Sequence, residues 1–318
     1  MYRYIIKRIL WLIPVLILVS LIVFTLMDIT PGDIVDTMIS ETTTAEDIEA
    51  LRQKYDLDKP MIYRYGKYMV HLVQGDLGVS DVSELSVWGM YIERLPNTLL
   101  LSLVALVIGA SLSIPLGINA AKKAGSVADT ATTTFALVGI SMPGFWLALL
   151  LLLVFSYYLK WLPAGGNKEF LSFILPAVCS GLMLMAGSTR QTRSSMLEVL
   201  RADYLRTARA KGVPEEAVIR KHALGNAMIP ILTTIGGSLS VSLAGSVVIE
   251  SVFAWPGVGR MAADAMTSRD TTTICGCVIL TSTLYVLIQL LVDLMYAFVD
   301  PRIKSLYANP GRKRKRVA

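Results

Sequence analysis

The sequence predicts an all-α protein that crosses a membrane six times, with a small extracytoplasmic domain between the first and second spans. Three observations lead to this prediction: the composition, the uncharged runs, and the charge of the segments between them. Of the 318 residues, 54% are hydrophobic and only 17% are charged. The mean hydropathy is +0.57, and values of this kind place the chain in the membrane class.

Six runs are long and uncharged enough for a transmembrane helix, which needs about 20 apolar residues. A soluble domain of this size would not need six such runs for its core. Pro143-Gly144 interrupts the third run, which is unusually long. The runs are Ile9–Met27, Thr98–Ala121, Thr130–Leu159, Phe170–Thr189, Ala223–Ile249 and Thr271–Val292, the last continuing to Val299 across Asp293.

The first run alone also fits a cleaved signal peptide, because Arg3, Lys7 and Arg8 precede it. Its length and the absence of small residues at 24–27 argue against cleavage and favour a retained span.

The charges between the runs predict the orientation, because Lys and Arg near the spans stay in the cytoplasm. With both termini inside, the cytoplasmic segments hold 20 of the 30 Lys and Arg residues. The outer segments hold 10 bases against 17 acids, of which 13 lie between Asp28 and Glu93. The net charge of +6 therefore averages a basic inner face and an acidic outer face, and it is no footprint of nucleic acid.

The chain divides accordingly into four parts. Residues 1–30 form the cytoplasmic end and the first span, 31–97 the extracytoplasmic domain, 98–300 a five-helix core, and 301–318 a basic cytoplasmic tail suited to anionic lipid headgroups. Within 31–97, the run from Thr42 to Asp47 resembles a capped helix start, followed by Ile48, Leu51 and Tyr55 at helical spacing. A second helix is expected after Pro60, with one face formed by Ile62, Tyr65, Met69 and Leu72.

The inner segment 190–226 predicts a helix, a hinge and a second helix. The fourth helix is expected to continue through a stripe of Leu197, Leu200, Tyr204 and Ala208, with Arg193, Arg201 and Arg209 facing water. Gly212 is a helix stop, and Pro214 with Glu215 and Glu216 is a helix start. From these residues alone, an ordinary basic loop at the membrane surface is the simpler interpretation.

The segment also resembles the cytoplasmic loop of ABC importer permeases, whose general pattern is E-A-A, three residues, then Gly. Asp203–Gly212 reads DYLRTARAKG, which matches the form D-Y-x-R-T-A-R-A-K-G that is characteristic of the peptide-transporter branch of this family. It departs from the general pattern in having Arg206 and Thr207 where Glu and Ala would stand. Further motifs of this family extend over nearly the whole chain. They are GDLGVS at 75–80, SMPGFW at 141–146, WLPAG at 161–165, ESVFAWPGVGR at 250–260 and DPR at 300–302.

The resemblance implies a type I ABC importer permease in a bacterial plasma membrane. A second homologous permease, two ATP-binding cassette subunits and an extracytoplasmic substrate-binding protein would be its partners. It also implies that the inner loop docks into the ATPase subunit and transmits its closure. The residues expected to couple to that subunit are Arg206, Thr207, Ala208, Arg209, Lys211, Gly212, Val213, Pro214, Glu215 and Glu216.

Two departures from the family pattern leave the individual member open: Leu224-Gly225-Asn226 stands where Leu-Arg-Asn is usual, and Thr271-Thr272 where Tyr-Pro is usual. The substrate would be a di- or oligopeptide, with nickel or another metal chelate as the alternative. An ion-coupled secondary transporter is a different alternative, for which Asp293 is the candidate coupling group.

The sequence offers no catalytic constellation for a membrane enzyme, and it has no G-x-x-x-x-G-K-[ST] phosphate loop. ATP and Mg²⁺ are therefore expected on partner subunits, and no cofactor is expected here. Cys179, Cys275 and Cys277 lie in apolar runs without a nearby His or acid, so we interpret them as small hydrophobic residues and not as a metal site. His71 and His222 are expected to make surface contacts, and no substrate-binding residue is identified.

Overall fold

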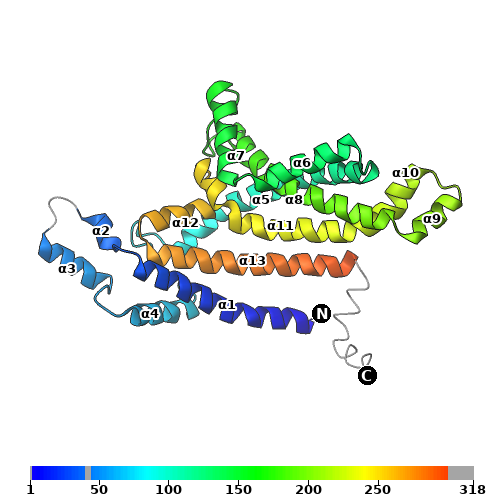
Figure 1. Ribbon diagram of the computed structural model, residues 1–318. Helices are drawn as coiled ribbons and strands as arrows, with labels where there is room; N and C mark the ends of the chain where they lie inside the picture. Colours follow the sequence, from blue (N-terminus) through cyan, green and yellow to red (C-terminus); the bar gives the residue numbers. More distant parts are fainter. Residues whose placement is uncertain (1, 40–43, 300–318) are drawn as a thin grey trace.

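The computed structural model describes residues 2–39 and 44–299, and this part of the chain is helical apart from turns and one isolated β-bridge between Val79 and Ser86. Short helices connect the long ones, and two π-helical segments, η1 and η2, extend α7 and precede α11 (Figure 1). The elements are α1 (Tyr2–Ile29), α2 (Ile34–Met38), α3 (Ala45–Lys54), α4 (Met61–Val73), α5 (Val87–Lys122), α6 (Val127–Ser141), α7 (Gly144–Leu151), η1 (Leu152–Tyr158), α8 (Phe170–Leu200), α9 (Asp203–Ala210), α10 (Glu215–Ala217), η2 (Val218–Ala223), α11 (Leu224–Val252), α12 (Val258–Thr267) and α13 (Thr271–Val299).

Within the described ranges, five helical segments are long and apolar enough to cross a membrane by themselves. They belong to α1, α5, α8, the continuous α10–η2–α11 segment and α13. A sixth candidate, 127–158, is broken after Ser141 and bent by 102°. The break falls at Pro143, the N-cap of α7, where the sequence predicts an interruption.

The packing of α5 on α8 decides how the bent pair is counted. A Cβ on Gly109 would lie 2.5 Å from Leu184, and one on Gly117 would lie 2.5 Å from Thr192, so α5 and α8 run in the same direction at close approach. Because α6 and α7 connect these two parallel helices, they must return the chain across the same layer. Counted as one broken span, the bent pair raises the number of candidate crossings in the described residues to six, the number that the sequence predicts.

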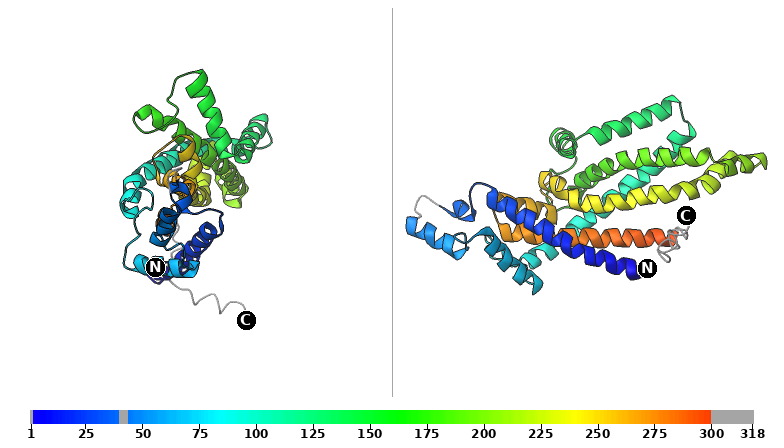
Figure 2. Two further views of the ribbon diagram at one scale, coloured as in Figure 1. Left: turned by 90° about the vertical axis from the view of Figure 1, so that its left-hand side faces the viewer. Right: turned by 60° about the horizontal axis from the view of Figure 1, so that its bottom comes forward.

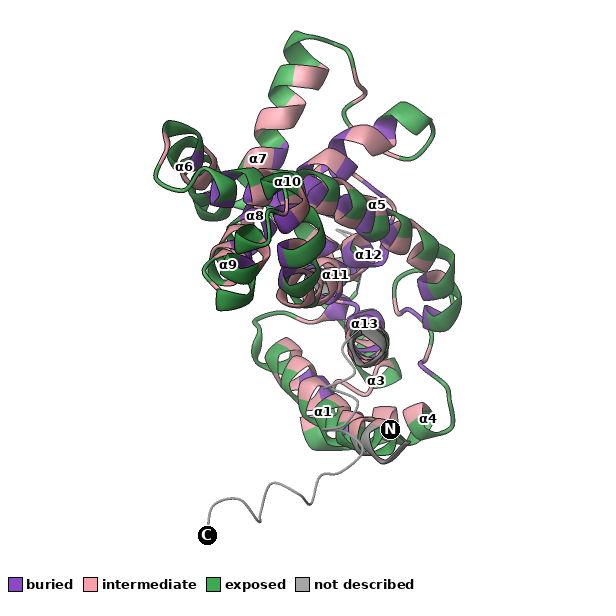
Figure 3. Ribbon diagram, turned by 90° about the vertical axis from the view of Figure 1, so that its right-hand side faces the viewer, coloured by how far each residue is buried: buried purple, intermediate pink, exposed green. Residues whose placement is uncertain are grey.

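The core lies where α5, α8, α11 and α13 meet, and α1 packs on the outside against α13. Figure 3 shows buried positions facing inward on α8, α11 and α13, while α1 and α4 are mostly exposed or intermediate. The largest exposed apolar side chains, such as Leu10, Trp11 and Leu18 of α1, face away from this core. That distribution suits a protein whose outer surface contacts lipid, where an exposed Leu costs nothing.

The segment between α1 and α5 forms a module that packs on the Ile29 end of α1 (Figure 2). Thr44 and Asp47 form the capping box of α3, which confirms the predicted start; Thr42 and Thr43 lie outside the described residues. In α4 the buried residue is Tyr65, which contacts Phe24 of α1 edge to face. The prediction for Ile62 was wrong: it is 69% exposed, because the inward face passes through Met61 instead.

The connection from α11 through α12 to α13 is held by two buried carboxylates. Glu250, which is 0% exposed, accepts hydrogen bonds from Thr98 Oγ1 at 2.8 Å and from the Arg260 backbone N–H at 3.0 Å. Asp270 accepts from Ser80 Oγ at 2.6 Å and from the backbone N–H and hydroxyl of Thr273. These contacts tie the outer half of the bundle to the first hundred residues.

Two helix boundaries differ from the sequence prediction. α5 begins at Val87, eleven residues before the expected span, so the end of segment 31–97 is already helical. The fourth helix does not run on through Ala208: α8 ends at Leu200, and α9 begins at Asp203 after a break at Arg201 and Ala202. Ala202 has the extended backbone of an N-cap, which turns α9 away from the axis of α8.

Candidate functional site

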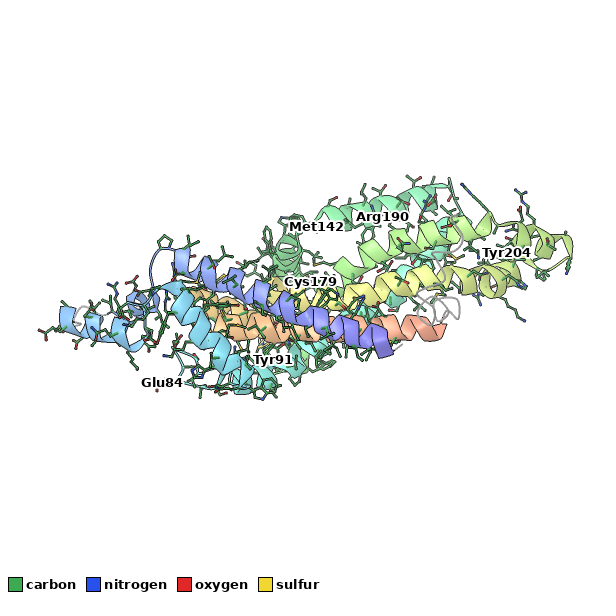
Figure 4. The ribbon with its side chains drawn as sticks, turned by 90° about the horizontal axis from the view of Figure 1, so that it is seen from below. Glu84, Tyr91, Met142, Cys179, Arg190 and Tyr204 are labelled. Carbon is green, nitrogen blue, oxygen red and sulfur yellow. The ribbon has the colours of Figure 1, made fainter. Side chains whose placement is uncertain are left out.

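The candidate site is the turn formed by α9, Gly212 and α10, at the end of the molecule opposite the α2–α4 module. Figure 4 shows Tyr204 of α9 at one tip and Glu84 toward the other. Eight of the ten residues predicted to couple are exposed, namely Arg206, Thr207, Arg209, Lys211, Gly212, Pro214, Glu215 and Glu216. The other two, Ala208 and Val213, pack against the apolar cluster at the inner ends of α5, α8 and α11.

The backbone at Gly212 has the geometry that the sequence predicts for a helix stop. Its φ is +76°, in the left-handed region that favours glycine. The Gly212 N–H donates to the Arg209 carbonyl at 2.9 Å, and the Val213 N–H donates to the Ala208 carbonyl at 3.3 Å. Those two bonds form a Schellman motif, and the pairing of Val213 with Ala208 is its usual apolar contact. The turn is therefore fixed by local backbone chemistry.

An ion pair spans the hinge from the end of α9 to the start of α10. Arg209 Nε and a terminal nitrogen each donate to a different oxygen of Glu215, both at 2.9 Å. Hydrogen bonding to that carboxylate raises the pKa of Arg209. Because both side chains are exposed, the pair contributes little to stability, and its two bonds link the end of α9 to the start of α10.

Two details of this region were missed by the sequence interpretation. Tyr204 was expected on the buried stripe, but it is 44% exposed and its hydroxyl accepts a hydrogen bond from Asn226 at 2.8 Å. The buried residue is Leu205, at 0% exposed, because the break after α8 restarts the helical register.

The second miss is Arg193, which was expected to face water. It forms a two-bond ion pair with Asp129 of α6, with donor–acceptor distances of 2.5 and 2.7 Å. No signal in the sequence joins residues 64 positions apart in two different helices. The available hint was an Asp immediately before the start of a predicted span, at Thr130.

The acid required by the ion-coupled alternative is also paired. Asp293 of α13 forms an ion pair with Arg8 of α1 and accepts a hydrogen bond from Gln289 at 3.3 Å. The charge therefore fastens α1 to α13, which gives Asp293 a structural role. In the described residues, no group of three His, Cys, Asp or Glu side chains could hold a metal ion.

Two hollows lie in the outer half of the described structure. A cleft of about 750 Å³ separates the α2–α4 module from the start of α13, and its wall includes Asp81, Arg269 and Thr272. Asp81 has a pKa raised to about 6, first by burial and then by the charge of Asp270. A smaller cavity of about 190 Å³ lies between α5, α11, α12 and α13 and is largely apolar. The described geometry does not single out either as a substrate site.

Comparison with known families covers nearly the whole chain. Residues 113–305 match the family described as binding-protein-dependent transport system inner membrane component, and residues 1–102 match the N-terminal component of the same systems. Together these matches span all of the long helices except residues 103–112 of α5.

Curated relatives are similar over their full length. The chain is 40% identical over 315 residues to the oligopeptide transport system permease protein AppB of Bacillus subtilis strain 168, covering 96% of this chain and 100% of the relative. It is 41% identical over 304 residues to the glutathione transport system permease protein GsiC of Escherichia coli O6:H1, strain CFT073, covering 96% and 99%.

Solved structures resemble the fold at low sequence identity. An inward-facing structure of the MetNI methionine ABC transporter aligns with a TM-score of 0.58 and 17% identity, covering 66% of this chain and 96% of that one. An amino acid ABC transporter solved with histidines aligns with a TM-score of 0.51 and 19% identity, covering 66% and 94%.

Proposed function

The chain belongs to the family of binding-protein-dependent transport system inner membrane components, and we propose that it is the permease subunit that carries peptides in an ATP-driven ABC importer. Its multi-pass helical fold suits that role, and the relatives named above are peptide and glutathione permeases. Those names favour a peptide over the metal-chelate alternative. Permeases of this family are transport subunits that work with ATPase and substrate-binding partners.

The observation that carries the proposal is the exposed α9–Gly212–α10 turn. Its polar rim is open to a partner, while Ala208 and Val213 fix its base to the bundle. Small residues at the turn let another backbone approach closely. We infer that two ATPase subunits hold ATP and Mg²⁺, that one of them receives this turn, and that its closure rocks this chain against a second homologous permease. Peptide would pass between the two permeases after delivery by the binding protein.

The proposal includes an orientation in which both termini and the α9–α10 turn are cytoplasmic, in a bacterial plasma membrane. Leu85 and Ala210 are both exposed and lie at opposite ends of the bundle. A cysteine at 85 should react with an impermeant maleimide in intact cells, and a cysteine at 210 only after permeabilisation. Labelling of position 210 from outside would contradict this orientation.

The coupling role is tested by replacing Gly212. A β-branched residue at φ +76° is strained by about 1–2 kcal/mol, which is too little to unfold a protein with six spans. It is enough to tilt α10, and the added bulk would obstruct close docking. Gly212→Val should leave the amount of assembled complex near normal while lowering peptide uptake and peptide-stimulated ATP hydrolysis together, measured on matched amounts of reconstituted complex.

Gly225→Val is the matched control, because Gly225 follows the same loop, and a Cβ there would meet nothing within 4 Å. It should retain most of the activity. Full coupled activity in Gly212→Val would show that the turn is a surface connection only, and the coupling assignment would be withdrawn.

A further inference from the structure

We propose that the ion pair between Asp129 of α6 and Arg193 of α8 is the joint through which movement of the α9–α10 turn reaches α6 and the bent crossing. The inference rests on the proposed coupling function and deepens it by naming two positioning residues. Neither residue belongs to the ten predicted to contact the ATPase.

The pair has the geometry of a fixed joint. Arg193 Nε donates to Asp129 Oδ1 at 2.5 Å, and a terminal guanidinium nitrogen donates to Oδ2 at 2.7 Å. Two parallel bonds between planar groups fix orientation as well as distance, which a lysine at the same place would not do. Asp129 is only 4% exposed, whereas the side chain of Arg193 is 28% exposed, so the pair is shielded from water on the carboxylate side.

The same carboxylate also holds the loop that enters α6. Asp129 Oδ2 accepts from the Gly125 N–H at 2.9 Å, Oδ1 accepts from Thr133 Oγ1 at 3.4 Å, and the Asp129 N–H donates to Ser126 Oγ at 3.3 Å. The loop between α5 and α6, the first turn of α6 and the C-terminal part of α8 therefore meet at one side chain. A displacement of α8 moves all three together.

A second contact makes α6 follow α8 along its length. Near the far end of α6, a Cβ on Gly139 would lie 2.9 Å from the Cβ of Ala186, so the two antiparallel helices are in close contact there. The polar joint at Asp129 lies ten residues earlier, about 15 Å along the helix. Two separated contacts transmit rotation, whereas one would allow α6 to pivot.

One end of this connection leads to the turn with the proposed coupling role, and the other leads to the bend between α6 and α7. Seven residues beyond Arg193, α8 ends at Leu200 and the chain enters α9. At its other end α6 runs into the 102° bend, after which Gly144 of α7 packs against Met183 of α8. Tilting of the α9–α10 turn is thereby linked through α8 and α6 to the elbow of the third crossing.

A purely structural role of the pair would change the stability of the complex and leave its coupling unaltered. A buried ion pair is weak evidence for stability, and its specific geometry can matter more than its energy. We therefore compare Arg193→Gln, Asp129→Asn and Arg193→Lys in reconstituted complex with its ATPase and binding-protein partners. Arg201→Gln is the control, an exposed arginine at the end of the same helix. The readout is the ratio of peptide-stimulated to basal ATP hydrolysis at matched amounts of complex.

Arg193→Gln and Asp129→Asn should lower that ratio about fivefold or more, the scale of a typical coupling free energy. Arg193→Lys, which keeps the charge and loses the fork, should fall between these variants and the unmodified complex. Arg201→Gln should leave the ratio unchanged. An unaltered ratio in Arg193→Gln and Asp129→Asn would overturn the inference.

Spin labels at Ala131 and Ala210, both exposed, give a readout independent of activity. Their distance distribution should stay narrow through the nucleotide cycle in the unmodified complex and broaden in Arg193→Lys, a variant mild enough to assemble. A distribution in Arg193→Lys as narrow as in the unmodified complex would also overturn the inference. If Gly212→Val uncouples while these variants do not, this inference alone fails; if Gly212→Val is also fully coupled, the proposed function of the turn fails.

Discussion

The inner turn at Gly212 and the two outer turns, at Ala254 before α12 and at Arg269 after it, have the same backbone hydrogen-bond pattern but different surroundings. All three end a helix with the paired hydrogen bonds of a Schellman motif. The inner turn has glycine at the left-handed position and open space around it, whereas the outer turns have Ala254 at φ +49° and Arg269 at φ +60°.

The difference shows two ways of fixing a turn. At Gly212 the conformation costs nothing, so local sequence is sufficient and the surface stays free for a partner. At Ala254 and Arg269 a side chain occupies a strained region, and tertiary contacts must compensate. Glu250 and Asp270 supply those contacts from buried positions. We infer that the inner turn is suited to contact a partner subunit, whereas the outer connection is fixed by contacts within this chain.

The largest effect is expected from removing the outer anchor. Glu250→Ala leaves the Thr98 hydroxyl and the Arg260 N–H without a buried acceptor, which should cost about 2 to 5 kcal/mol of unfolding free energy. The measurement is thermal or denaturant unfolding in detergent. Glu216→Ala at the inner turn should change stability by about 0.5 kcal/mol or less, because its ion pair with Arg220 is exposed. Equal stabilities for the two variants would refute the comparison.

A second contrast separates lack of space from backbone strain. A Cβ on Gly257 would lie 2.3 Å from the Glu250 carboxylate, so Gly257→Ala should cost about 1 to 3 kcal/mol through overpacking. A Cβ on Gly212 would meet nothing within 4 Å, so Gly212→Ala should cost about 1 kcal/mol through its positive φ alone. The same unfolding assay measures the loss of stability in both variants. A larger loss in Gly212→Ala than in Gly257→Ala would show that the region around Gly257 can rearrange to accept the added methyl group.

The pH dependence of stability tests a third carboxyl group of the outer region, that of Asp81, which lies near Asp270. Burial and the nearby Asp270 raise the pKa of Asp81 to about 6 in the folded chain, above its ordinary value of 3.8. The folded state therefore binds the proton more tightly, and this carboxyl makes stability rise as pH falls from about 6 toward 4. Asp81→Asn should flatten that rise, by about 1 kcal/mol after allowance for solvent. A rise of unchanged size in the variant would assign the effect to another group.

The smallest effect is expected at Ala254. Replacing it by glycine relieves the left-handed strain of about 1 kcal/mol but adds backbone freedom to the unfolded chain, so Ala254→Gly should stabilise by about 0.5 kcal/mol or less. A small rise in the unfolding midpoint is the expected readout. A fall of 1 kcal/mol or more would indicate that the Ala254 methyl group makes a packing contribution larger than the strain.

Prediction from the sequence was most accurate where the cause is local. The break at Pro143, the capping box at Thr44 and Asp47, and the left-handed Gly212 are each determined by residues within a few positions. It failed where a helix boundary changed the register, as at Tyr204 and Leu205. A two-residue break after α8 is enough to put Leu205 in place of Tyr204 on the buried face.

The sequence by itself indicated the long apolar helices, the break at Pro143 and the helix stop at Gly212, because hydrophobicity, capping and backbone sterics act over short distances along the chain. Only the tertiary structure decided which distant groups meet: Asp129 with Arg193, Thr98 with Glu250 at a separation of 152 residues, and Arg8 with Asp293. The physical reason is that these bonds depend on how the spans pack side by side. The close approaches at Gly109, Gly117 and Gly139 set that packing, and no local rule contains it.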